Sequence, residues 1–161
     1  MLTLGIDPGT ATTGYGLVKM TGNQLKMIEY GCIKTAKDLS PAVRLQMIYK
    51  ELNVLIKKLK PDELSIEQLF FNKNITTAIS VAQARGVILL CAAQNDLLCG
   101  EYTPPQIKLA VTGYGKAEKK QVQYMVQKLL CLEKIPKPDD AADALAVAIC
   151  HLHSRTLSYR A

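Results

Sequence analysis

The sequence predicts an α/β protein in which helices cover one mixed β-sheet. Residues 2–34 contain three strand patterns joined by connections too short for a helix, so these strands should pair antiparallel. After residue 40, strand patterns alternate with helix patterns, which implies parallel pairing through right-handed crossovers. A length of 161 residues suits one domain spanning 1–161.

Alternation of apolar and polar residues predicts the first strand at residues 2–7, and Pro8-Gly9 ends it. The second and third strands are expected at about 14–20 and 26–34, on either side of a turn. Side chains alternate between the two faces of a strand. If Leu2, Leu4 and Ile6 face the core, Asp7 at the end of the strand is expected to face away from it.

A helix is expected after residue 40, with Ser40 as a candidate N-cap and Pro41 at the first helical position. Pro61 ends it, and a short strand follows at 64–67. The spacing of the helix's apolar residues places them on one face. They are Leu45, Ile48, Leu52, Leu55 and Leu59.

The next helix, at about 75–93, is apolar almost all round, which predicts that it is buried. Ala78, Ala82 and Gly86 form a stripe of small residues at a spacing of four. Such a stripe lets another element approach closely, either from the same subunit or from a symmetry mate.

The last third of the chain should hold a strand near 97–102 and helices at about 104–111 and 117–130. A final helix should run from Asp139 or Asp140 to about His153, with Asp139 as its cap. His151 and His153 are then expected at a frayed helix end.

Composition excludes several classes of protein. A hydrophobic fraction of 48% with 21% charged residues is that of a globular chain. Five scattered cysteines without a CxxC pair favour free thiols in a reducing compartment. No leader pattern or apolar run long enough for a membrane span is present, which predicts a cytoplasmic protein with no membrane partner.

The net charge of +6 indicates an anionic partner, and nucleic acid is favoured over a membrane surface. Residues 104–138 contribute +5 of that charge, because they hold seven basic and two acidic residues. This stretch is either a set of solvated helix faces or a surface that faces phosphates. Its bases are Lys108, Lys116, Lys119, Lys120, Lys128, Lys134 and Lys137.

Four acids are candidates for a metal site. Asp7 and Glu67 end strands, while Asp140 and Asp143 are three apart on one helix face. Taken singly, each acid has a structural explanation in a turn, on the surface or at a helix start. Together they suit Mg²⁺ or Mn²⁺, which prefer oxygen ligands, and two-metal cleavage of phosphodiesters requires such a cage. Neither a GxSxG nucleophile motif nor a GxxxxGK[ST] phosphate loop is present.

Five motifs occur in an order and spacing that resemble the RuvC family of bacterial Holliday-junction resolvases, over essentially the whole chain. They are Gly5-Ile6-Asp7-Pro8-Gly9-Thr10, Glu67-Gln68-Leu69-Phe70, Ala84-Arg85-Gly86, Gly113-Tyr114-Gly115-Lys116-Ala117-Glu118-Lys119 and Asp140-Ala141-Ala142-Asp143-Ala144.

The resemblance implies an RNase H-like fold: a five-stranded mixed sheet of three antiparallel strands and two parallel additions, flanked by helices. It implies a structure-specific endonuclease of recombination and repair. This homodimer would cut two opposing strands of a four-way DNA junction symmetrically and leave 5′-phosphate nicks. It also implies two Mg²⁺ ions per active site, replaceable by Mn²⁺, and partnership with the RuvA–RuvB branch-migration complex.

The resemblance also assigns residues. Asp7, Glu67, Asp140 and Asp143 match the family's catalytic, metal-binding acids. Lys108 and Lys119 match lysines that contact DNA or support catalysis, Lys119 being assigned to catalysis, and Phe70 matches an aromatic that unstacks bases at the crossover. Lys116 and Lys120 are expected to contact DNA beside them, and the helix at 75–93 is expected to form the dimer contact. Asp139, directly before the acidic pair, leaves an ambiguity of one residue.

Three rival interpretations remain at this point. Asp7-Pro8-Gly9-Thr10 also fits the turn of actin- or Hsp70-like ATPases, although these need two domains around the nucleotide. A module that binds junctions without cutting them would lack a metal ligand. A third rival is a nuclease of the same fold that acts on RNA–DNA hybrids or transposon ends.

Overall fold

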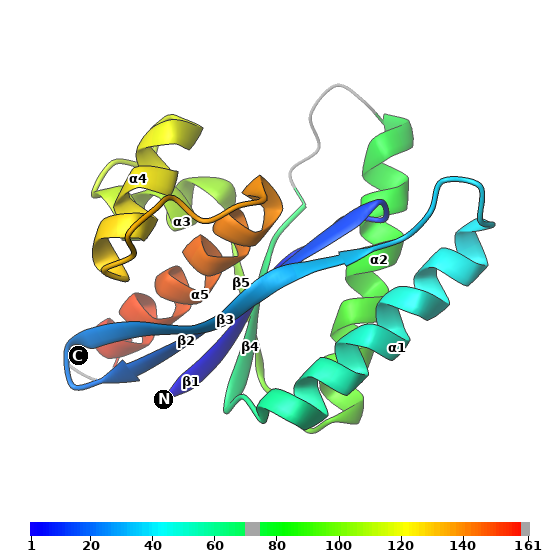
Figure 1. Cartoon of the computed structure of the whole chain (residues 1–161), viewed down its shortest axis with the longest axis horizontal. Helices are drawn as coiled ribbons and strands as arrows, with labels where there is room; N and C mark the ends of the chain where they lie inside the picture. Colours follow the sequence, from blue (N-terminus) through cyan, green and yellow to red (C-terminus); the bar gives the residue numbers. More distant parts are fainter. Residues whose placement is uncertain (70–74, 159–161) are drawn as a thin grey trace.

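The structure, a computed structural model, describes residues 1–69 and 75–158 and contains one five-stranded sheet with helices on both faces (Figure 1). The strand order is β3-β2-β1-β4-β5. The first three strands pair antiparallel, and β4 and β5 are added parallel to β1. The predicted mixed sheet is therefore confirmed. The strands are β1 (Leu2–Asp7), β2 (Thr12–Thr21), β3 (Gln24–Lys34), β4 (Glu63–Glu67) and β5 (Cys99–Tyr102).

Two helices cover one face of the sheet, and the other three lie on the opposite side (Figure 1). Of these three, α5 packs directly on β1 and β2, while α3 and α4 pack against α5. The helices are α1 (Pro41–Leu59), α2 (Ile75–Gln94), α3 (Pro104–Thr112), α4 (Lys119–Leu129) and α5 (Asp139–Ser158). As predicted, Ser40 caps α1 by accepting a hydrogen bond from the Val43 amide, and Pro41 begins the helix.

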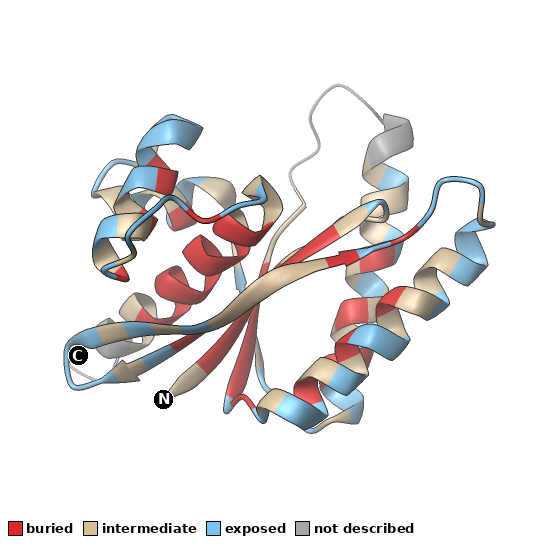
Figure 2. Cartoon of the chain, viewed as in Figure 1, coloured by how far each residue is buried: buried red, intermediate tan, exposed pale blue. Residues whose placement is uncertain are grey.

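Apolar residues fill both sides of the sheet (Figure 2). Leu4 and Ile6 of β1 are fully buried in the cluster beneath α1 and α2. The opposite cluster includes Val18 of β2 and Leu145 of α5. The expectation that Asp7 faces away from the core is therefore wrong. The face of β1 that carries Asp7 is covered by α5.

The close packing of α5 depends on glycines in the strands beneath it. A β-carbon added at Gly5 would lie 2.2 Å from the Ala144 carbonyl oxygen. One added at Gly14 would lie 2.0 Å from the Asp140 carbonyl oxygen. Neither distance is physically possible, so only glycine lets the first turns of α5 come down on β1 and β2.

The predicted burial of the helix at 75–93 is wrong in part. One side of α2 packs on the sheet through Ala84 and Ile88, but Ile79 and Leu90 are 56% and 54% exposed. A β-carbon at Gly86 would meet nothing within 4 Å. An all-round apolar sequence thus has one apolar face left open in the single chain, and Gly86 is not in close contact with another described element.

The predicted frayed end of the last helix is also wrong. The helix α5 continues to Ser158, His151 is only 4% exposed, and His153 Nδ1 lies 3.0 Å from the Ala110 carbonyl oxygen. Asp139 lies inside the first turn rather than at the cap. The Pro138 carbonyl accepts from the Ala142 amide, and Asp139 accepts a hydrogen bond from Lys137.

Candidate active site

The acids gather at one end of the sheet because of how the strands pair. Ile6 of β1 is the parallel partner of Ile66 of β4, so Asp7 and Glu67, the next residue of each strand, end neighbouring strands. The first turns of α5, which carry Asp140 and Asp143, lie over the same end because Gly14 beside Asp7 admits the helix backbone.

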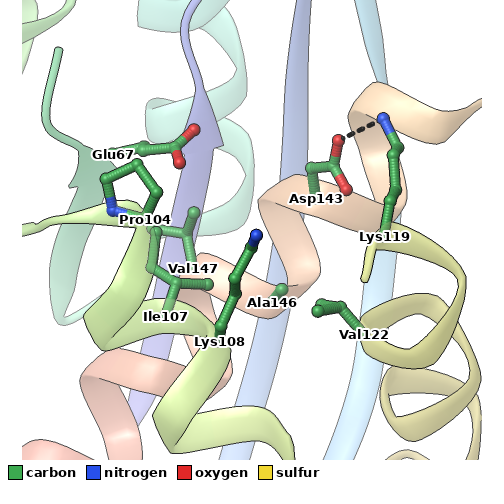
Figure 3. A pocket seen from close by; sticks show the side chains of 9 residues that line it. All are labelled: Glu67, Pro104, Ile107, Lys108, Lys119, Val122, Asp143, Ala146 and Val147. Carbon is green, nitrogen blue, oxygen red and sulfur yellow. Dashed lines mark hydrogen bonds and ion pairs between the residues drawn. The ribbon is translucent and has the colours of Figure 1, made fainter. Parts of the chain in front are cut away.

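Glu67 and Asp143 line one pocket of about 250 Å³ together with Lys108 and Lys119. Figure 3 shows the Glu67 carboxylate on one side, Asp143 with Lys119 on the other, and the Lys108 amine pointing up between them. The pocket has an apolar floor, which lowers the local dielectric constant and strengthens electrostatic interactions at its mouth. The floor is formed by Pro104, Ile107, Val122, Ala146 and Val147.

Asp7 is the most perturbed acid of the group. Burial, and after it the negative charges of Glu67, Asp143 and Asp140, together raise its pKa to about 8. Lys119 opposes the shift. A carboxylate that is desolvated and surrounded by other carboxylates keeps its proton unless a positive charge is supplied.

The two acids that line the pocket show the same effect in milder form. Burial and then Asp143 raise the pKa of Glu67, against the lysines at 108 and 119. Burial raises the pKa of Asp143 as well, and a 2.8 Å hydrogen bond from Lys119 Nζ opposes it. The pKa of Lys119 is raised chiefly by that hydrogen bond, so this lysine carries its positive charge within the acidic group.

A divalent cation fits this group in donor chemistry. All the donors are carboxylate oxygens, the type that hard cations prefer, and their raised pKa values show that they repel one another. Among residues 1–69 and 75–158, no three acid, histidine or cysteine side chains already lie close enough together to hold an ion. The structure thus assembles suitable donors without drawing them to coordination distance.

The remaining predicted residues have different locations. Lys116 is exposed and does not line the acidic pocket. Lys120 is exposed and lines a separate pocket of about 440 Å³ with Tyr114 and Tyr124. Phe70 lies outside the described residues.

Two supports of the site had no role in the sequence-based prediction. Arg85 Nε of α2 donates to the Glu67 carbonyl oxygen at 3.3 Å, and Arg85 also pairs with Glu101 of β5. Gly5 and Gly14 seat the acidic helix. Glycine inside a strand is a recognisable signal of close backbone approach, so these two positions were detectable in principle.

Comparison with known proteins identifies the family. The family model described as "Crossover junction endodeoxyribonuclease RuvC" matches residues 3–151. The chain belongs to the RuvC family. RuvC of Syntrophomonas wolfei is 58% identical over 158 residues, covering 98% of this chain and 92% of that protein. RuvC of Pelotomaculum thermopropionicum is 55% identical, covering 97% and 95%.

Solved RuvC structures agree with this assignment. The Thermus thermophilus RuvC structure matches with a TM-score of 0.92 at 29% identity, covering 98% of this chain and 97% of that chain. Thermus thermophilus RuvC in complex with Holliday junction substrate matches with a TM-score of 0.93 at 29% identity, covering 98% and 96%. The RNase H-like fold is therefore confirmed.

RuvC family members are metal-dependent crossover junction endodeoxyribonucleases, and this chain is an enzyme of that class. The ATPase interpretation of Asp7-Pro8-Gly9-Thr10 is not supported, because the match to RuvC covers nearly the whole chain. Among the described residues, no helix has the combination of length and apolar character that crossing a bilayer requires.

Proposed function

We propose that this chain resolves four-way DNA junctions by metal-dependent hydrolysis of phosphodiesters on two opposing strands, leaving 5′-phosphate nicks. The observation that carries the proposal is the gathering of Asp7, Glu67, Asp140 and Asp143 at one sheet end, where the pKa of Asp7 is raised to about 8. In a RuvC family member, buried acids that repel one another are well suited to binding metal ions.

The proposed roles follow from position. The four acids hold Mg²⁺, two ions per site with Mn²⁺ able to substitute, and these supply water activation and stabilisation of the leaving oxygen. Lys119, already bound to Asp143 at 2.8 Å, and Lys108, pointing into the same pocket, stabilise negative charge that develops on the phosphate. Lys116 and Lys120 contribute phosphate contacts outside the pocket.

The exposed face of α2 supports the proposed homodimer. Ile79 and Leu90 are large, apolar and more than half exposed, and Gly86 between them has open space above it. Two coordinated cuts in a junction with approximate two-fold symmetry need two sites related by a similar axis. A second copy of the chain is the occupant that joins these two requirements. Partnership with RuvA–RuvB is proposed from the family resemblance, and a cytoplasmic location from the sequence analysis.

The test uses a synthetic immobile four-way junction, a linear duplex and an RNA–DNA hybrid, each with Mg²⁺ or EDTA. Paired symmetric nicks only in the junction, and only with Mg²⁺, are expected. Cleavage of the hybrid instead would favour the other nuclease class. Junction binding with no cleavage under any metal condition would favour the binding module.

The residue assignment is tested with Asp7→Asn. It should abolish cutting and keep junction binding, because it removes a metal ligand and leaves the basic surface intact. Asp38→Asn makes the same change on an exposed residue between β3 and α1 and should cut normally. Cutting by Asp7→Asn at the wild-type rate would show that the site is wrongly assigned.

A further inference from the structure

A second polar cluster is buried away from the candidate active site, where α5 meets the start of β4. Its centre is His151 of α5, which is 4% exposed and lies 2.6 Å from Glu63 Oε2 at the start of β4. Tyr102, the last residue of β5, places its hydroxyl 2.9 Å from His151 Nδ1. The cluster lies away from the acidic pocket and has no place in the proposed cleavage.

The hydrogen bonds of this cluster have one consistent direction. Burial lowers the pKa of His151, so its ring is neutral at pH 7 and carries one N–H. Because Glu63 can only accept, His151 Nε2 donates to it, and Nδ1 then accepts from the Tyr102 hydroxyl. Arg155 occupies the other Glu63 oxygen at 2.8 Å. Both ring nitrogens of His151 and both carboxylate oxygens of Glu63 therefore have a defined partner.

The strand beneath His151 is shaped to receive the ring. A β-carbon added at Gly100 of β5 would lie 2.4 Å from His151 Nδ1 and 2.7 Å from its Cε1. Gly100 has no positive φ that would require glycine for backbone reasons. Its lack of a side chain instead makes room for the imidazole.

Residues of β4 and α5 face each other at two points, with similar spacing along the two elements. Glu63 and Glu67 are four residues apart on a strand, which is about 13 Å. His151 and Asp143 are eight residues apart on a helix, which is about 12 Å. The first pair is Glu63 and His151, which share a hydrogen bond. The second pair is Glu67 and Asp143, which line the same pocket.

The two pairs differ in the kind of contact that they make. Glu67 and Asp143 lie on opposite sides of one pocket (Figure 3), while the hydrogen bond between Glu63 and His151 holds β4 and α5 together. A buried, fully satisfied polar network rigidifies the elements it joins. The contact between Glu63 and His151 therefore lies where it can fix the separation of Glu67 and Asp143.

We propose that His151 is a positioning residue: by holding Glu63, it sets the distance between β4 and α5 and thereby the separation of Glu67 and Asp143 at which the metal is bound. This inference rests on the proposed function, because it assigns a role in metal binding. The alternative is that the cluster stabilises the fold and has no influence on the metal.

Two amide substitutions of His151 test the two hydrogen bonds of its ring one at a time. In His151→Gln the amide nitrogen can take the place of Nε2 and donate to Glu63. In His151→Asn the shorter amide reaches only the place of Nδ1, so the bond to β4 is lost. Leu52→Ala, in the core on the opposite face of the sheet, serves as a control that lowers stability without touching the cluster.

We expect His151→Asn to weaken Mn²⁺ affinity, measured by calorimetry without DNA, by about tenfold, with a matching rise in the Mg²⁺ needed for half-maximal cutting. His151→Gln should remain within about twofold of wild type. Junction binding in EDTA should be unchanged in both. Equal Mn²⁺ affinity in His151→Asn, His151→Gln and Leu52→Ala would overturn the proposal.

A second variant covers the case in which His151→Asn does not fold. Gly100→Ala pushes the ring away while leaving every partner in place, and it should also weaken Mn²⁺ affinity. Wild-type Mn²⁺ affinity in a folded Gly100→Ala protein would overturn the proposal. If the wild-type chain itself neither bound Mn²⁺ nor cut junctions, the proposed function would fail instead, so the two failures are distinguishable.

Discussion

At the scale of single residues, the carboxyl group of Asp7 couples folding to pH. Its pKa is raised from 3.8 to about 8, mainly by burial and then by neighbouring acids. The folded state therefore binds a proton that the unfolded state has lost between these pH values. Stability must fall as pH rises from about 4 to 8, because the slope follows the difference in bound protons.

Asp7→Asn removes this penalty. A rise in pKa from 3.8 to about 8 corresponds to about 6 kcal/mol. Without metal, the variant should therefore unfold roughly 10 to 20 °C above wild type at pH 9, and close to wild type at pH 4. Adding Mg²⁺ at pH 8 should stabilise only the wild type. Thermal unfolding in EDTA across this pH range checks the prediction, and parallel curves for the two proteins would contradict it.

Lys108 allows a second test at this scale. Its amine points into the acidic pocket, and its charge lowers the pKa of Glu67. Lys108→Ala should weaken binding to junctions of every sequence and reduce the salt slope of the binding constant by about 1. Lys57→Ala, on α1 across the sheet, should leave the slope unchanged. The same slope in both variants would show that Lys108 does not contact DNA.

At the scale of elements, the seating of α5 on strand glycines determines whether the acids meet. The Asp140 carbonyl occupies the space that a β-carbon at Gly14 would need. The helix carrying Asp140 and Asp143 can therefore approach Asp7 only while Gly14 lacks a side chain. Both the assembly of the proposed metal site and the stability of the fold therefore require glycine at position 14.

Gly14→Ala should cost about 3 kcal/mol or more of unfolding free energy, because backbone in both elements must shift to relieve the overlap. Denaturant unfolding measures this loss. Gly115→Ala is the matched control, since its β-carbon would come no closer than 3.4 Å to any atom, an ordinary contact distance. Equal stability of the two variants would contradict the close packing of α5.

Sequence patterns predicted most elements well because each pattern reports local physics. The Ser40 cap and the Pro41 start of α1 are local signals, because each acts within the first turn of the helix. The alternation in residues 2–7 places Leu4 and Ile6 on the face of β1 beneath α1 and α2. The patterns failed for His151, because a histidine near the end of a predicted helix is expected to be exposed to solvent. Its burial depends on Glu63, which is 88 residues earlier in the chain.

At the scale of the whole molecule, α2 has an apolar face, with Ile79 and Leu90 more than half exposed, that no other described element covers. Burying Ile79 and Leu90 would stabilise an assembly by the hydrophobic effect, at roughly 25 cal/mol per Å² of apolar surface. A second copy of α2 would supply matching apolar surface around the open Gly86 position.

The proposed homodimer predicts that Leu90→Arg shifts the protein from dimer to monomer in analytical ultracentrifugation, because a charge would be buried at the contact. Thermal unfolding should stay cooperative. Single nicks should then replace paired symmetric nicks. Val54→Arg is the control, since Val54 lies on α1 and is 64% exposed. A dimer that persists in Leu90→Arg would show that this face is not the contact.

The sequence by itself determined the order of elements, the RuvC-like motifs and the four acids, because these depend on local periodicity and on residue types at particular positions. Their assembly was decided only by the tertiary structure. Strand pairing makes Asp7 and Glu67 neighbours, and glycine contacts bring α5 onto them. The perturbed pKa of Asp7 and the hold of His151 on Glu63 arise from residues far apart in the chain, and no local pattern encodes such distances.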